Sequence, residues 1–130
     1  MHVLLDLTIE AQPELAAPLR ARVREATRSR YSTGAVDDAV LVADEFFSVA
    51  AANGVGSARF RLQGTSRVVD LTLTIHQAGA LAPTGIGSSR SRILDGICAG
   101  WRVHENARGT VLWASLVDTQ RGIERRRRRL

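Results

Sequence analysis

The chain has 130 residues, of which 45% are hydrophobic and 24% charged, and these proportions are typical of a soluble globular protein. All 18 basic residues are arginines, so Schiff-base chemistry and a lysine clamp for phosphate are excluded. The formal net charge of +5 comes from five arginines at 125–129, because the other 13 basic residues equal the 13 acidic ones. We therefore predict one domain over residues 1–120 and an arginine-rich tail over residues 121–130.

The first ten residues lack the basic segment and cleavage site of a signal peptide, so we predict a cytoplasmic protein. No apolar run approaches the ~20 residues of a membrane span, and no membrane contact is expected. The single Cys98 cannot form a disulfide within the chain, and its small apolar neighbours indicate an inert, buried thiol in a helix. The three histidines show no paired spacing, so we expect no metal site.

The first element in chain order is a predicted strand over residues 2–10, because apolar and polar residues alternate along it. Its apolar face would consist of Val3, Leu5, Leu7 and Ile9. A helix over residues 12–30 is expected next, since apolar residues follow at helical spacing and Pro13 suits a helix start.

A second helix is expected over residues 35–53 by the same apolar spacing. Asp37 and Asp38 would stand in its first turn, where acidic side chains favour the helix dipole. Asn53 and Gly54 form a typical helix end.

Two further alternating segments, residues 57–63 and 68–77, are separated by a short glycine-containing stretch and predict a hairpin. Same-face pairing in this hairpin would place Arg61 opposite Asp70, or Arg59 if the register slips by two residues.

A third helix is expected over residues 89–101, followed by strands over residues 101–106 and 109–117 that form a last hairpin. If Trp113 stands beside Val111 on a face of the sheet without helices, the two would form an apolar patch suited to a partner or a second copy.

The strands have only one apolar face each, which indicates helices on one side of the sheet. The order is strand, helix, helix, strand, strand, loop, helix, strand, strand. We therefore predict an α/β fold, a two-layer sandwich with a mixed, mostly antiparallel sheet and helices on one face.

The second helix also carries a possible catalytic residue, because Glu45 and Val49 lie four residues apart and hence on one helix face. The chain resembles the GHKL-type (Bergerat) ATP-binding fold in three features. These are the element order, the position of Glu45 on the second helix, and the segment "SRILDGICAGWRV" leading into "GTVLWASL". More narrowly, the chain is similar to the RsbW-like anti-sigma-factor serine kinases. The resemblance covers about residues 3–117.

The resemblance implies a role for each matching position. Glu45 corresponds to the catalytic base, and Val49 occupies the position of the asparagine that holds Mg²⁺. Valine cannot bind this cation, which requires oxygen ligands, so no metal ligand is expected here. Gln77, or alternatively His76, matches the aspartate that recognises adenine.

The phosphate-binding part of the resembled motif is also altered. Gly85 and Gly87 come several residues too early, and Ser88 and Arg90 stand where glycines are expected. Thr110 and Val111 follow the last turn glycine, Gly109, in place of a lysine–threonine pair. These departures indicate degenerate nucleotide-binding motifs.

Three functions remain open. The first is a regulatory protein-binding module that has lost Mg-ATP binding and catalysis, whose partners would be a sigma factor, an anti-anti-sigma-type protein or a second copy. The second is an active ATP- and Mg²⁺-dependent serine kinase, with Glu45 as base, Gln77 on adenine and residues 85–92 on the phosphates. These residues can also be interpreted without a catalytic or binding role. In that case Glu45 lies on a solvated helix edge and Arg90 lies on the surface.

The third function is association with nucleic acid through the tail, which would bind weakly and without sequence preference. The residues concerned are Arg125, Arg126, Arg127, Arg128 and Arg129. Such runs of like charge usually stay solvated.

Overall fold

The structure is a computed structural model that describes residues 1–77 and 86–119. Its elements, in chain order, are β1 (His2–Glu10), a short 3-10 helix η1 (Pro13–Leu15), α1 (Ala16–Thr27), α2 (Thr33–Ala52), β2 (Ser57–Gly64), β3 (Val68–Ile75), α3 (Ser88–Ile97), β4 (Gly100–Asn106) and β5 (Gly109–Val117). Among the described residues, no helix is long and apolar enough to cross a lipid bilayer.

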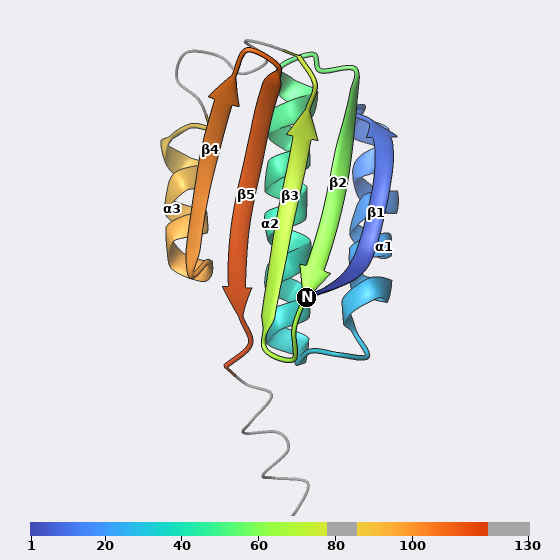
Figure 1. Cartoon of the computed structure of the whole chain (residues 1–130), viewed down its shortest axis with the longest axis vertical. Coiled ribbons are helices and arrows are strands. Elements are labelled where there is room, and N and C mark those ends of the chain that lie inside the picture. The colour runs from blue at the N-terminus through green and yellow to red at the C-terminus, as the bar shows by residue number, and fades with distance from the viewer. Residues whose placement is uncertain (78–85, 120–130) are drawn as a thin grey trace, which may run out of the picture.

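The strands form one five-stranded sheet in the order β1-β2-β3-β5-β4, so the last strand in the chain lies between β3 and β4. All four neighbouring pairs are antiparallel, so the sheet formed by the described residues is entirely antiparallel and not mixed as predicted from the sequence. Figure 1 shows the helices behind the sheet, which leaves its front face without helices. The predicted two-layer α/β sandwich with helices on one face is therefore confirmed.

The core lies between the sheet and α2. Phe46 and Phe47 of α2 are buried against strand residues that alternate with polar ones, as the sequence predicted. The strand residues that are completely buried include Phe60, Leu62, Leu71, Leu73, Ile75 and Leu112. Burial of such side chains contributes roughly 1.5–3 kcal/mol each relative to exposure.

The predicted apolar face of β1 is correct except at its start. Leu5 is buried and Leu7 and Ile9 are partly buried against the core, but Val3 is 51% exposed. The register with β2 shifts between Val3 and Leu5, and this irregularity turns Val3 away from the face that Leu5 occupies.

The register predicted for the β2–β3 hairpin is wrong. Gln63, not Arg61 or Arg59, lies opposite Asp70, because only residues 65–67 separate the two strands. The two arginines turn to β1 instead. Arg59 binds Asp6 with an Nη2–Oδ2 distance of 2.6 Å, and the Nε of Arg61 lies 3.5 Å from the same oxygen.

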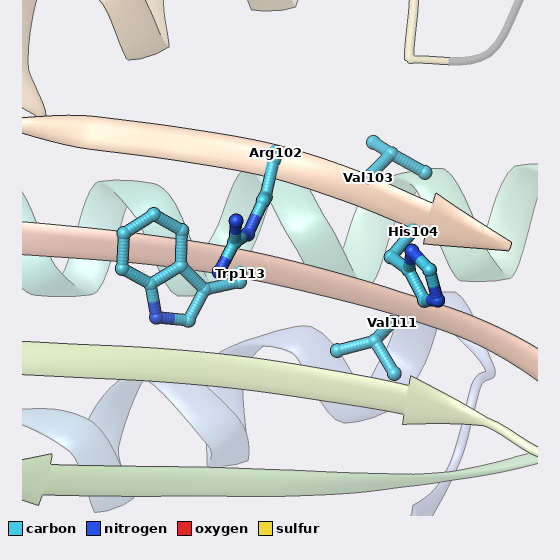
Figure 2. A pocket seen from close by; sticks show the side chains of 5 residues that line it. All are labelled: Arg102, Val103, His104, Val111 and Trp113. Atoms are coloured by element: carbon cyan, nitrogen blue, oxygen red, sulfur yellow. The ribbon is translucent and has the colours of Figure 1, made fainter.

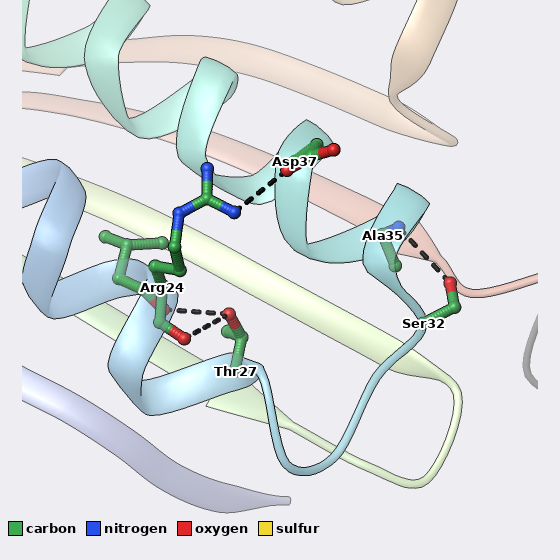
Figure 3. Close-up of polar contacts among 6 residues, drawn as sticks. Arg24, Thr27, Ser32, Ala35 and Asp37 are labelled. Atoms are coloured by element: carbon green, nitrogen blue, oxygen red, sulfur yellow. Dashed lines mark hydrogen bonds and ion pairs between the residues drawn. The ribbon is translucent and has the colours of Figure 1, made fainter.

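The start of α2 also differs from the prediction. Ser32 caps the helix by accepting a hydrogen bond from the N–H of Ala35 at 3.3 Å (Figure 3). Because the helix begins at Thr33, Asp37 and Asp38 lie beyond its first turn. Asp37 instead accepts a hydrogen bond from Arg24 of α1 at 2.9 Å, which joins the two helices.

The remaining boundaries differ by a few residues. The predicted helix over residues 12–30 is divided into η1 and a shorter α1, and α2 ends before Asn53 and Gly54 as expected, with Gly54 at a φ of +67°. α3 ends at Ile97 rather than at residue 101, since Ala99 already donates a hydrogen bond to the carbonyl of Ser115 at 2.8 Å.

Candidate functional site

The residue predicted as a catalytic base, Glu45, forms an ion pair with Arg90. Glu45 projects from α2 and Arg90 from the first turn of α3, and the Arg90 Nε lies 3.0 Å from the Glu45 Oε2. The side chain of Glu45 is 18% exposed and that of Arg90 is 36% exposed. The pair therefore lies at the partly solvated contact between the two helices.

This ion pair changes what Glu45 can do. A general base must be within hydrogen-bond reach of the proton that it removes, with its carboxylate free to accept that proton. Here the Nε of Arg90 lies 3.0 Å from one carboxylate oxygen as an ion pair without a hydrogen bond from that Nε, and Arg90 stands where the resembled motif has a glycine beside the phosphates. The sequence suggested Arg90 as an anion ligand but gave no signal that its anion is Glu45, since 45 residues separate the two.

The position that corresponds to the metal-binding asparagine of the resembled family is part of the core. Val49 is 2% exposed and packs with the other buried residues of α2. Its carbonyl oxygen accepts a hydrogen bond from the Asn53 side chain at 2.7 Å. Within residues 1–77 and 86–119, no three His, Cys, Asp or Glu side chains cluster as metal ligands would.

Gln77 and Thr110 lie at the same end of the sheet but in different environments. Gln77 is exposed just beyond β3, whereas Thr110 is 1% exposed and lies opposite Ile75. The Thr110 hydroxyl donates a hydrogen bond to the Glu105 carboxylate at 3.2 Å. No hydrogen bond or ion pair among the described residues joins either residue to the Glu45–Arg90 pair.

The start of α3 is an exposed helix end that follows a glycine. Gly87 precedes the helix with a φ of +90°, a conformation that favours glycine, and Ser88 is exposed at the first helical position. The Gly87 carbonyl accepts a hydrogen bond from the Ser91 hydroxyl at 2.8 Å. Gly85 and the five tail arginines lie outside the described residues.

The front face of the sheet carries an apolar patch between β4 and β5. Trp113 and Val111 share this face, as expected if the strand alternates regularly, and the guanidinium carbon of Arg102 lies 5.0 Å from the Trp113 ring centroid. These side chains, together with His104 and Val103, line a pocket of about 480 Å³. Figure 2 shows the five side chains. The patch thus combines an aromatic ring with a cation.

Cys98 follows the end of α3 rather than lying within it and is half-buried. Burial, together with the negative charges of Asp38 and Asp95, raises the pKa of its thiol to about 11. We expect Cys98 to react with iodoacetamide at pH 8 at least tenfold more slowly than a free cysteine, because the thiolate is the reactive form. Mass spectrometry of timed samples measures this rate, and equal rates in the folded and urea-unfolded chain would contradict the prediction.

Comparison with known proteins gives the architecture a class. No protein-family model and no curated protein matches the chain. A solved structure, the crystal structure of the RsbU and RsbW domains of Rv1364c from Mycobacterium tuberculosis, is similar over 88% of this chain, with a TM-score of 0.69 and 18% sequence identity. The chain spans 32% of the length of that chain.

These findings show an α/β fold of the GHKL, or Bergerat, type. Within that class, the architecture is RsbW-like, as the sequence resemblance implied. At 18% identity, this likeness concerns the fold alone.

Proposed function

We propose that the protein is a regulatory protein-binding module on an RsbW-like scaffold, in which the former nucleotide site no longer supports Mg-ATP chemistry. The observation that carries the proposal is the ion pair between Glu45 and Arg90, with its Nε–Oε2 distance of 3.0 Å. In this ion pair, the carboxylate that would act as the base is paired with Arg90. Arg90 belongs to the segment that would surround the phosphates.

The buried Val49 supports the same conclusion. In phosphoryl transfer, Mg²⁺ bridges the phosphates and neutralises the charge that develops on them. An apolar side chain that is 2% exposed supplies neither an oxygen ligand nor space for a hydrated cation. Two independent parts of the catalytic apparatus are thus replaced, one by an arginine and the other by core packing.

The partners that fit this proposal are a sigma factor or an anti-anti-sigma-type protein. The patch of Trp113, Val111 and Arg102 supports a protein-binding role, because aromatic and arginine side chains are enriched where protein interfaces concentrate their binding energy. Arg102 would favour an acidic residue on the partner at this patch.

An active serine kinase is the second candidate, and one observation favours it. Gly87 and the exposed Ser88 leave the N-terminus of α3 in a form that can bind an anion through backbone N–H groups. Activity would then require Arg90 to leave Glu45 and bind a phosphate group, with Gln77 on adenine and a replacement metal ligand.

Calorimetric titration of the full chain with ATP and ADP, with and without Mg²⁺, separates the two candidates. We expect no binding heat at millimolar nucleotide in the wild type, and none after Val49→Asn, because Arg90 still occupies Glu45. Micromolar affinity that Mg²⁺ strengthens would contradict the proposal. Arg90→Ala tests the ion pair directly, and Arg92→Ala, which removes an exposed arginine of the same helix, is the matched control.

A further inference from the structure

Three segments that are distant in the sequence meet at one end of the molecule. They are the α1–α2 connection, the β2–β3 turn and the residues that directly follow β5, and Figure 1 shows all three at the end where β5 terminates. The hydroxyl of Tyr31 donates a hydrogen bond to the Thr65 carbonyl at 2.6 Å. The N–H of Asp118 donates one to the Arg67 carbonyl, also at 2.6 Å. These contacts fix the three segments against one another.

Two of these segments carry an arginine without an acidic partner. Arg30 precedes Tyr31 in the α1–α2 connection, Arg67 lies in the β2–β3 turn, and both are exposed. Within residues 1–77 and 86–119, neither forms an ion pair. By contrast, the nearby Arg28 is paired with Glu25 at 3.0 Å. Arg30 and Arg67 therefore present positive charge that no described carboxylate neutralises.

The arginine-rich tail continues from the same end of the molecule. Asp118 is buried and hydrogen-bonded to Ser32, so the chain is held in place up to the last described residue, Thr119. At up to ~3.6 Å per residue, the run of arginines at 125–129 begins within about 25 Å of Asp118. The folded body and the tail can therefore contact the same ligand.

We propose that this end binds the phosphate backbone of double-stranded DNA, with Arg30 and Arg67 of the folded body and the five arginines of the tail on neighbouring phosphates. Guanidinium groups suit this ligand because they donate two parallel hydrogen bonds to a phosphate. A duplex carries one negative charge per ~1.7 Å of its length, so a reach of ~25 Å covers about 15 charges. The proposal is independent of the nucleotide site and of the protein partner proposed above.

The side chains at this end favour a duplex over a single strand. Proteins that bind single strands stack the unpaired bases on aromatic side chains. The aromatic side chains near this end are engaged elsewhere, since Tyr31 is 7% exposed and hydrogen-bonded and Trp101 donates its ring N–H to Asp95 at 2.7 Å. A duplex needs no such platform, because contacts to its phosphates are sufficient to hold a protein without reading the sequence. Five consecutive like charges also match a uniformly charged polymer better than a protein surface, where polar and apolar groups are mixed.

The salt dependence of DNA binding tests the proposal in the full chain. Fluorescence anisotropy of a labelled DNA duplex of mixed sequence measures the affinity at several salt concentrations. Each phosphate contact contributes about 0.9 to the slope of log affinity against log salt. In the double variant Arg30→Gln with Arg67→Gln, the magnitude of the slope should therefore fall by about 1.8. Glutamine in place of all five arginines at 125–129 should lower it by up to about 4.5.

Arg108→Gln is the matched control for the double variant. Arg108 is also an exposed arginine in a turn, but this turn joins β4 to β5 at the opposite end of the sheet. Its replacement should leave the slope unchanged. Arg30→Lys with Arg67→Lys keeps both charges and should keep the slope as well. All these side chains are exposed, so we expect equal thermal midpoints for the variants and the wild type.

Duplex binding with a slope that falls by about 1.8 in the double variant, and that Arg108→Gln leaves unchanged, would support the proposal. An unchanged slope in the double variant would show that the tail binds alone, and a comparable loss in Arg108→Gln would show that only net charge matters. Either result would overturn the proposed surface. Absence of duplex binding at about 50 mM salt, or equally tight binding of a single strand of the same sequence, would overturn the proposed ligand.

Discussion

Replacing Asp118 by alanine is expected to lower the free energy of unfolding by about 3 kcal/mol. Asp118 is 2% exposed, and its carboxylate accepts hydrogen bonds from the Ser32 N–H at 2.8 Å and the Ser32 hydroxyl at 2.7 Å. Since Ser32 is also the cap of α2, the variant would leave buried donors unsatisfied at the start of the central helix. The midpoint of urea denaturation measures the loss.

The matched control for this variant is Asp37→Ala. Asp37 is also an aspartate of this region, in the second turn of α2, but its ion pair with Arg24 joins side chains that are both more than half exposed. Exposed ion pairs typically contribute about 0.2–1 kcal/mol, so this variant should hardly move the midpoint. Equal midpoint shifts in Asp118→Ala and Asp37→Ala would show that the buried contact stabilises the protein no more than the exposed ion pair does.

The second large effect is expected from Gly109→Ala, which should destabilise the protein by about 3 kcal/mol. Gly109 begins β5, and a methyl group at this position would overlap the carbonyl oxygen of Ile75 in the neighbouring strand. Backbone cannot move aside as a flexible side chain does, so the start of β5 would separate from β3. A lower thermal midpoint, followed by circular dichroism, measures the effect.

Gly96→Ala is the control for Gly109→Ala. Gly96 lies within α3, and a methyl group there meets no atom within 4 Å. Alanine favours a helix over glycine by roughly 0.5–1 kcal/mol, so this variant should be slightly more stable than the wild type. If Gly109→Ala were as stable as Gly96→Ala, the close approach of β5 to Ile75 would not exist in solution.

The sequence was sufficient to predict the architecture because regular alternation survives in the strands. In β2, for example, Ala58, Phe60 and Leu62 are buried while Arg59 lies on the other face. The errors occur where one local feature, a turn length or a strand irregularity, decides which residues pair or become buried. The length of the β2–β3 turn moved Asp70 away from the arginines, and the irregular start of β1 exposed Val3.

The candidate site was only partly predictable. The sequence pointed to Glu45 and Arg90 separately, and it identified Val49 as unable to bind a metal ion. It could not predict that the first two bind each other, or that Asp118 reaches Ser32, because the latter contact spans 86 residues. Contacts between distant parts of a chain depend on the assembled fold and leave no periodic signal in the sequence.

The place of β5 in the sheet has a consequence for synthesis on the ribosome. A chain emerges from its N-terminus at about 5–20 residues per second, so β3 is exposed before the strand that lies between it and β4. Until Gly109–Val117 has emerged, the inner edge of β3 remains open to pairing with other nascent chains. Stopping translation before residue 109 should therefore yield an aggregation-prone intermediate that binds chaperones. Release of the full chain allows β5 to insert between β3 and β4 and to complete the sheet.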